Sequence, residues 1–181
     1  MINIDLSSVI NRPVDEVWKC LTNPSIAKQW MSGLLQVNSI SGGPWNVGTK
    51  IRKVQRFIGL RTEMVYDTTV YEPNRKLAYK TASGTLSGPL SYEASITLES
   101  IESGTKLIYT GRGELGGFFK LVEPVFTRWA RRRFKNDLNI FKELVEARVM
   151  APIYIALSKS NELQDFTDGK FLVVNTNLLG I

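Results

Sequence analysis

Residues 2–10, INIDLSSVI, alternate between apolar and polar side chains, which predicts a half-buried β-strand at the start of the chain. Two short helices are expected to follow it. Pro13 has the backbone angle favoured at a first helical position, and the next eight residues place an apolar face on that helix. Asn23 is a good N-cap and Pro24 a good first residue, so a second helix is expected with Ile26, Ala27 and Trp30 on one side.

From Thr49 to Glu114 the pattern changes to short runs rich in Val, Ile, Thr and Tyr, separated by turn residues. Such a succession predicts an antiparallel meander, because short connections join neighbouring antiparallel strands. Residues 91–99, SYEASITLE, alternate most clearly, with Tyr92, Ala94, Ile96 and Leu98 on one face. The expected strands are KIRKVQRFI, TEMVYDTTVY, KLAYKTA, SYEASITLE and TKLIYTGRG.

A long helical segment, from Gly117 to about Arg148, remains to cover the apolar face of this sheet. At about 100° per residue, its apolar side chains share one side and its basic side chains fall on the other. Arg133 lies within the apolar arc, where Asp137 at i+4 is expected to pair with it. Pro124 is expected to start or kink the regular helix. The apolar side comprises Phe119, Val122, Phe126, Trp129, Ala130, Phe141 and Leu144, and the basic side Arg128, Arg131, Arg132 and Lys135.

The segment TRWARRRFK, residues 127–135, holds five positive charges within a chain of net charge +6. A nucleic-acid interface would need aromatic or base-reading side chains on the same face as these charges, but Trp129 and Phe134 point elsewhere on the helical wheel. The pattern therefore favours a solvated helix face. Contact with nucleic acid, an anionic membrane or an acidic partner is the alternative.

Other motifs point to no cofactor. Gly111, Gly113 and Gly116 spell GxGxxG, but the fingerprint belongs to a parallel βαβ unit, and here it ends an antiparallel run. The simpler interpretation is that these glycines let the last strand bend. The chain has no histidine and one cysteine, Cys20, so the usual zinc motifs and an intramolecular disulfide are excluded. Cys20 is expected to be a buried structural thiol.

The order of strand, two short helices, antiparallel strands and long helix resembles the START-like superfamily, the polyketide cyclase/dehydrase and lipid transport group. The resemblance covers about residues 3–147. It implies an α+β helix-grip fold, in which a curved antiparallel sheet wraps around a long carboxy-terminal helix, with two short helices between the first and second strands. Its motifs are NRPVDEVWKCLTN, VYEPNRKLAY, SGTKLIYTG and LVEPVFTRWARRRFKNDLNIFKELVE.

This resemblance also implies an internal cavity for a small hydrophobic or aromatic molecule, bound without a cofactor. The residues expected in its wall are Trp30, Met64, Tyr66, Tyr79, Tyr92, Tyr109, Phe126 and Trp129. Plain core packing is the alternative for each, since cavities and cores have similar linings. The leading hypothesis is a carrier, sensor or chaperone of such a molecule. The alternatives are a cyclase/dehydrase-like enzyme and an interaction module with a filled core.

An enzyme would have to use Asp, Glu, Lys, Tyr or Cys for acid–base chemistry, because histidine is absent. Arg52, Arg112, Glu63 and Glu114 lie on predicted strands and could form a carboxylate–arginine site. Surface ion pairs are the alternative for these four residues. The sequence shows no complete catalytic constellation.

The helix-grip domain is expected to span residues 1–151, followed by an extension over residues 152–181. Pro152 breaks the helix, and the extension is apolar enough to dock on its own domain or on a second copy in a homodimer. The amino terminus lacks the basic and apolar regions of a signal peptide, and the apolar run VMAPIYIAL is too short to span a bilayer. A cytoplasmic protein is expected.

Overall fold

The structure is a computed structural model that describes residues 1–42, 44–57, 60–85, 88–115 and 117–148. The chain divides into two units, Met1–Glu146 and Ala147–Ile181. The predicted docking of residues 152–181 lies outside the described residues. The elements, in chain order, are β1 Ile2–Ile10, α1 Val14–Leu21, α2 Pro24–Trp30, β2 Leu34–Ser39, β3 Lys50–Phe57, β4 Leu60–Glu72, β5 Lys76–Thr85, β6 Gly88–Ile101, β7 Gly104–Leu115, a 3₁₀ helix Gly117–Val122 and α3 Glu123–Arg148.

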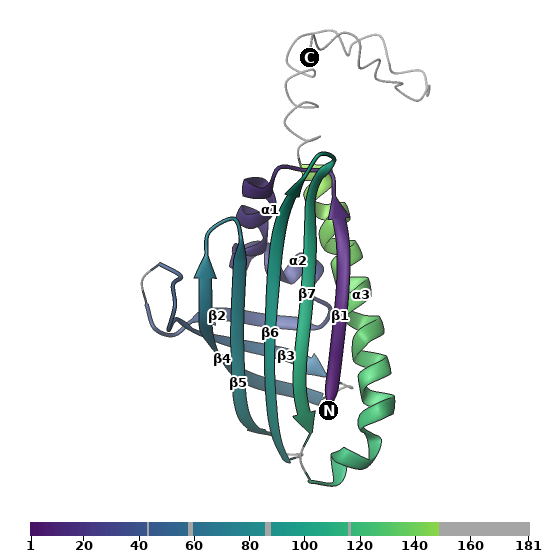
Figure 1. Ribbon diagram of the computed structural model, residues 1–181. Helices are drawn as coiled ribbons and strands as arrows, with labels where there is room; N and C mark the ends of the chain where they lie inside the picture. Colours follow the sequence, from purple (N-terminus) through teal and green to yellow (C-terminus); the bar gives the residue numbers. More distant parts are fainter. Residues whose placement is uncertain (43, 58–59, 86–87, 116, 149–181) are drawn as a thin grey trace, which may run out of the picture. The chain divides into compact units, whose positions relative to one another are not determined.

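A seven-stranded antiparallel sheet forms the body of the first unit, in the order β1-β7-β6-β5-β4-β3-β2. The strand β1 pairs with β7, the last strand of the described residues, and the strands from β2 to β7 form a meander. The sheet is strongly curved, so that β2 and β3 run across the direction of β6, β7 and β1 (Figure 1). A register shift between Thr68 and Val70 interrupts the pairing of β4 with β5. Such irregularities increase the local bend of a strand.

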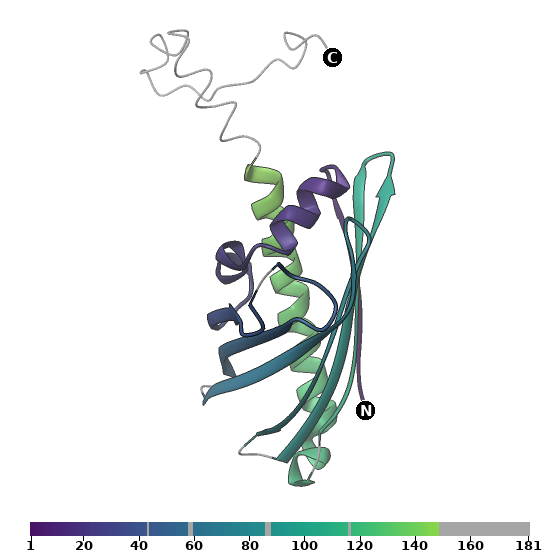
Figure 2. The same ribbon diagram turned by 90° about the vertical axis from the view of Figure 1, so that its left-hand side faces the viewer.

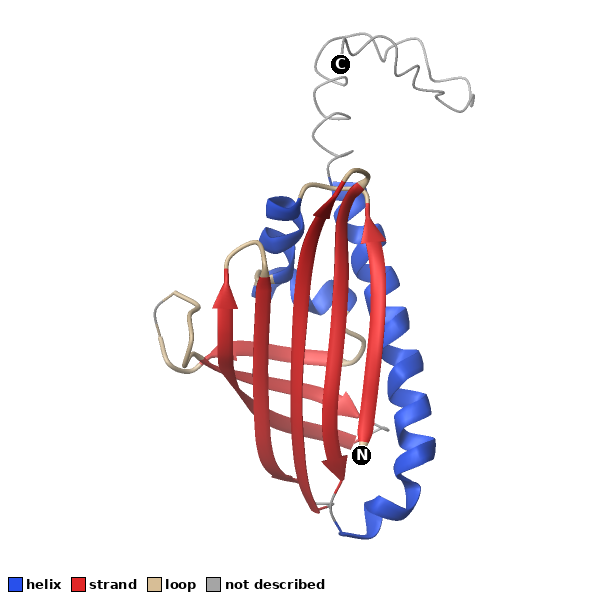
Figure 3. Cartoon of the chain, in the orientation of Figure 1, coloured by secondary structure: helices blue, strands red, loops and turns tan. Residues whose placement is uncertain are grey.

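The three α-helices lie on one face of this curved sheet (Figures 2 and 3). The core between them is apolar, and its most deeply buried side chains include Ile4, Val17, Leu107, Phe141 and Val145. This arrangement is the α+β helix-grip fold predicted from the sequence, with a long carboxy-terminal helix and two short helices between β1 and β2.

Local sequence explains most of these elements. In β6 the residues Ala94, Ile96 and Leu98 are buried, whereas Glu99 is exposed, as the alternation predicts. In α2 the side chain of Asn23 accepts a hydrogen bond of 2.9 Å from the backbone N–H of Ser25, which confirms its role as N-cap. The first helix begins one residue later than expected, because Pro13 is extended and precedes it.

The strand β2 was not predicted. Its sequence, LLQVNS, has no clean alternation, and only Leu34 is buried, because the strand forms an edge of the sheet. Its pairing with β3 shifts register between Leu34 and Gln36. A short and largely exposed edge strand has little of the two-residue period on which a sequence-based prediction depends.

The helix α3 starts next to Pro124, as expected, and its basic side chains Arg128, Arg131, Arg132 and Lys135 are exposed. The apolar side was only partly predicted correctly. Of the predicted side chains, Ala130 and Phe141 are buried, but Val122 in the 3₁₀ helix is 43% exposed and Trp129 is 38% exposed. These two side chains therefore do not cover the sheet as the helical wheel suggested.

The expected pairing of Arg133 with Asp137 is replaced by contacts to the turn after α2. Arg133 donates to the carbonyl of Ser32 and stacks over the ring of Trp129, 5.4 Å from its centroid. Asp137 accepts hydrogen bonds from the backbone N–H and the hydroxyl of Ser32. Burial raises the pKa of Asp137 despite these bonds. Both side chains thus tie α3 to the turn that leads into β2.

Among the described helices, none is long and apolar enough to cross a membrane.

Candidate functional site

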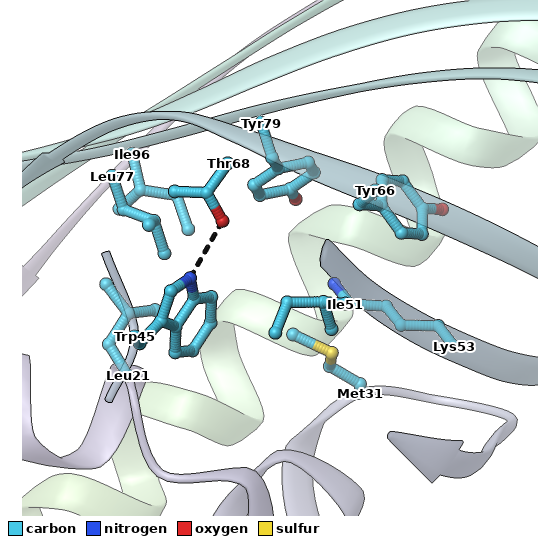
Figure 4. A pocket seen from close by; sticks show the side chains of 10 residues that line it. All are labelled: Leu21, Met31, Trp45, Ile51, Lys53, Tyr66, Thr68, Leu77, Tyr79 and Ile96. Carbon is cyan, nitrogen blue, oxygen red and sulfur yellow. Dashed lines mark hydrogen bonds between the residues drawn. The ribbon is translucent and has the colours of Figure 1, made fainter. Parts of the chain in front are cut away.

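Two adjoining cavities lie where β3, β4 and β5 face α1, α2 and the segment that carries Trp45. The inner cavity has a volume of about 30 Å³, which is room for little more than a water molecule. Its wall is mainly apolar and aromatic, and Figure 4 shows its side chains. They are Leu21, Met31, Trp45, Ile51, Lys53, Tyr66, Thr68, Leu77, Tyr79 and Ile96.

The outer cavity is larger, with a volume of about 240 Å³. It shares five wall residues with the inner cavity, namely Leu21, Met31, Trp45, Ile51 and Lys53. Its other wall residues include Pro24 and the exposed Ser39, so this cavity reaches the protein surface between α2 and β2. An apolar cavity of about 150 Å³ holds benzene in another protein, so the outer cavity has room for a substituted aromatic ring.

The sheet places the aromatic wall residues by its register. Ile51 on β3 pairs with Tyr66 on β4, and Thr68 on β4 pairs with Tyr79 on β5. The rings of Tyr66 and Tyr79 meet edge to face, with centroids 5.3 Å apart. Trp45, opposite them, donates its indole N–H to the Thr68 hydroxyl at 2.8 Å (Figure 4). This hydrogen bond fixes the orientation of the indole ring in the wall.

Lys53 is the charged residue of this wall. Its ammonium nitrogen lies 4.8 Å from the ring centroid of Tyr66 and 4.9 Å from that of Tyr79, which is cation–π geometry. Burial among these rings lowers the pKa of Lys53 to about 8. At neutral pH the amine is therefore mostly protonated, but much closer to its titration point than a solvated lysine.

Behind this wall Tyr92 and Tyr109 form a hydroxyl network. The hydroxyls of Tyr92 and Tyr109 lie 2.6 Å apart. Burial raises the pKa of Tyr92 to about 12 and the pKa values of Tyr66, Tyr79 and Tyr109 further. All four hydroxyls therefore stay protonated at neutral pH and can donate hydrogen bonds.

Two glycines of the GxGxxG motif make room for this network. Gly111 and Gly113 lie within β7, which pairs with β1 and β6, so they form no phosphate-binding loop. A Cβ atom at Gly111 would lie 2.1 Å from the Tyr92 hydroxyl, and one at Gly113 would lie 2.7 Å from the Tyr92 ring. The glycines are needed because the ring of Tyr92 crosses directly over β7.

The eight predicted wall residues fall into four places. Tyr66 and Tyr79 line the inner cavity. Met64, Tyr92 and Tyr109 lie beside it, with the Met64 sulfur 3.4 Å from the Tyr66 hydroxyl. Trp30 is buried against Phe141, at a centroid distance of 4.9 Å, and its indole N–H has no hydrogen-bond partner in the described part of the chain. The last two, Phe126 and Trp129, contact one another near the start of α3 and do not belong to the described walls of the two cavities.

The carboxylate–arginine site that the sequence left open is not formed. Arg52 pairs with Glu63 across β3 and β4 at 2.5 Å, and Arg112 pairs with Asp5 rather than Glu114, at 2.8 Å. These side chains are partly exposed to solvent. Cys20 is half-buried in α1. Within the described ranges, no group of three or more His, Cys, Asp or Glu side chains is arranged to hold a metal ion.

Sequence reasoning missed most of the wall residues of the two cavities, among them Met31, Trp45 and Lys53. Trp45 stands in the turn-like segment GGPWNVG, and Lys53 stands in the highly charged strand KIRKVQRFI. The two-residue period of a strand could have predicted the position of Lys53, because it puts Lys53 on the same face of the strand as Ile51.

Comparisons with known proteins agree with this fold. Residues 1–146 match the family model described as polyketide cyclase / dehydrase and lipid transport. No curated protein matches the sequence.

Solved structures show the same fold at low sequence identity. The crystal structure of TTHA0849 from Thermus thermophilus is 15% identical, with a TM-score of 0.67 over 81% of this chain and 98% of that one. A conserved protein from Geobacillus kaustophilus is 19% identical, with a TM-score of 0.64 over 79% and 93% of the two chains. The Aha1 dimer from Colwellia psychrerythraea, solved in solution, is 21% identical, with a TM-score of 0.59 over 81% and 97%. Because its family model covers most of the sequence, the chain belongs to the polyketide cyclase / dehydrase and lipid transport family.

Proposed function

We propose that this domain binds a small hydrophobic or aromatic molecule in the outer cavity and acts as its carrier, sensor or chaperone. The observation that supports this function best is the surface opening of a cavity of about 240 Å³ next to the aromatic wall of Trp45, Tyr66 and Tyr79. Ligand sites are typically concave and apolar, with a few convergent polar groups. Here those groups are the Lys53 amine, which both cavities share, and the Thr68 hydroxyl of the inner cavity.

Carriage is preferred over catalysis because the wall offers little acid–base chemistry. No Asp or Glu belongs to either cavity wall in the described residues, and Tyr66 and Tyr79 keep their protons at neutral pH. A cyclase or dehydrase needs a group that exchanges protons near neutral pH. Among the described wall residues, Lys53 is the one whose pKa approaches that range.

The test is binding of the neutral dye N-phenyl-1-naphthylamine, whose fluorescence rises in an apolar environment. The variant Ser39→Trp places a large ring at the mouth of the outer cavity from an exposed position on β2. We expect the wild-type protein to bind the dye with 1:1 stoichiometry and Ser39→Trp to bind it at least about tenfold more weakly, since a blocked pocket excludes the ring.

The matched control is Asn38→Trp. Asn38 is the preceding exposed residue of β2, and its side chain points to the opposite face of the strand. The Asn38→Trp variant should bind the dye as the wild-type protein does. If both variants bind normally, the dye does not enter through this mouth. If the wild-type protein binds no dye at all, the interaction module with a filled core becomes the better account.

A further inference from the structure

The ammonium group of Lys53 points into the inner cavity rather than to solvent. It projects from β3 toward the rings of Tyr66 and Tyr79, near Ile51 and Met31 (Figure 4). Lys53 also belongs to the wall of the outer cavity. A molecule that fills the outer cavity therefore meets this cation at its inner end.

Lys53 differs from its neighbours Lys50 and Arg52 on β3 because it has no anionic partner. Lys50 pairs with Asp67 at 2.9 Å, and Arg52 pairs with Glu63 at 2.5 Å. Lys53 forms no ion pair or hydrogen bond within the described residues, and it contacts two aromatic faces instead. A further positive charge, Arg133 on α3, also acts on Tyr66. Arg133 also acts on the carboxylate of Asp137, so the uncompensated positive charge of the site is that of Lys53.

An uncompensated cation in an apolar cavity is unfavourable, and an anion that reaches it relieves the cost of its burial. Cation–π contact offsets part of that cost and keeps the amine in place. The hydroxyl of Tyr79 remains protonated and is available as a donor for the same anion, whereas the hydroxyl of Tyr66 donates to the Met64 sulfur.

The size of the inner cavity restricts the anionic group. A volume of about 30 Å³ is small, so it favours a compact anionic group such as a carboxylate at the cavity entrance over a phosphate with its larger oxygen shell. One ammonium group supplies a single positive charge without the forked geometry of arginine, which also suits a monoanion. The hydrocarbon part of the molecule would remain in the outer cavity, against Leu21, Met31 and Trp45.

We propose that Lys53 binds the carboxylate of an apolar or aromatic monocarboxylic acid, which makes such acids the ligand class of the cavity. This inference rests on the proposed function, because it specifies the ligand of the same site. Lys53 then recognises the charge of the ligand, and the outer cavity recognises its shape.

The experiment compares acids with neutral analogues of the same shape in displacement of N-phenyl-1-naphthylamine. The pairs are 1-naphthylacetate with 2-(1-naphthyl)ethanol, and octanoate with 1-octanol. At pH 7 we expect the wild-type protein to prefer each acid by roughly 10- to 100-fold, the usual range for a hydrogen bond to a charged group. Lys53→Met should abolish this preference and keep the affinity for the alcohols.

Lys50→Met is the matched control, because Lys50 lies on the same strand but is exposed and paired with Asp67. It should retain the preference for acids. If the dye binds but acids show no advantage in the wild type, or keep it in Lys53→Met, the inference is wrong while the proposed function stands. If the acids fail to displace a bound dye, the assignment of an anion site to Lys53 is likewise wrong. If neither dye nor ligands bind, both proposals are wrong.

A second measurement needs no variant. Because burial sets the pKa of Lys53 near 8, the wild-type protein should lose affinity for the acids by about tenfold between pH 7 and pH 9.5. Affinity for the alcohols should not change, since Tyr66 and Tyr79 stay protonated over this range. Equal pH dependence for acids and alcohols would overturn the assignment of Lys53.

Discussion

The two ends of the space between sheet and helices are built from different kinds of side chain. Under β1, β6 and β7 the core is filled mainly by apolar groups, among them Ile4, Leu107 and Phe141, each with no exposed surface. Under β3, β4 and β5 the wall residues Lys53, Tyr66 and Tyr79 have apolar bodies and polar tips, and cavities remain between them. One curved sheet thus provides stability at one end and a site at the other.

The polar ends of these wall side chains explain why cavities remain under β3, β4 and β5. A buried hydroxyl or amine needs a partner, so close apolar packing around it is unfavourable unless a partner is supplied. Among the described side chains, the hydroxyls of Tyr92 and Tyr109 form a hydrogen bond with one another. The Lys53 amine contacts only the faces of aromatic rings. The difference between the two ends predicts opposite responses to mutation.

The largest effect should come from the filled end. Phe141→Ala removes a ring with no exposed surface that packs against Trp30, and it should lower the free energy of unfolding by roughly 3–5 kcal/mol. Urea denaturation measures this change. A loss below about 1 kcal/mol would show that this end is not the packed region of the domain.

At the open end, Lys53→Met should stabilise the protein. It replaces a buried cation by an apolar chain of similar length, and at pH 7 we expect a gain of roughly 1–2 kcal/mol in the free energy of unfolding. The native pKa of about 8 lies below the ordinary value of 10.5, so the wild type gains stability as the pH rises between these values. The advantage of the variant should therefore shrink above pH 8. Urea denaturation at pH 7 and pH 9.5 checks both statements, and an advantage that grows with pH would contradict the assignment.

Tyr109→Phe should have a smaller effect. It removes the 2.6 Å hydrogen bond to Tyr92 and leaves the apolar packing against Phe134 in place, so we expect a loss of about 1 kcal/mol. Thermal unfolding followed by circular dichroism measures it. A stabilised variant would mean that the hydroxyl network does not contribute to the fold.

The smallest effect is expected on the exposed face of α3. The double variant Arg128→Ala and Arg132→Ala removes two exposed charges, and its stability should stay within about 0.5 kcal/mol of the wild type. Urea denaturation in parallel with Phe141→Ala gives the contrast directly. A large loss would show that these arginines make structural contacts, contrary to the solvated face inferred from their pattern.

The sequence predicted the fold well because the long strands and the helix caps leave strong local signals. The alternation in residues 91–99 and the N-cap at Asn23 are both present as expected. Local patterns gave wrong predictions where contacts between elements determine which side chains are buried. Val122 in the 3₁₀ helix and Trp129 in α3 were expected on the buried apolar side, yet they are 43% and 38% exposed.

The site was predicted less completely for a similar reason. Tyr66 and Tyr79 follow from strand period and chemistry, since aromatic residues with polar tips are common in pockets. Lys53 could not be singled out among the charges of KIRKVQRFI, because its burial depends on which segments pack against β3. Trp45 comes from a connecting segment whose position depends on its hydrogen bond to Thr68.

The most direct test of ligand binding at the open end uses methyl NMR of the four methionines. Met31 lines both cavities, Met64 lies beside Tyr66, and Met1 is 69% exposed at the amino terminus. With ¹³C-methyl-labelled protein, titration with N-phenyl-1-naphthylamine or 1-naphthylacetate should shift the Met31 signal most and leave Met1 unchanged, with Met31→Leu supplying the assignment. A Met31 signal that stays fixed at saturating ligand would contradict a binding site in these cavities.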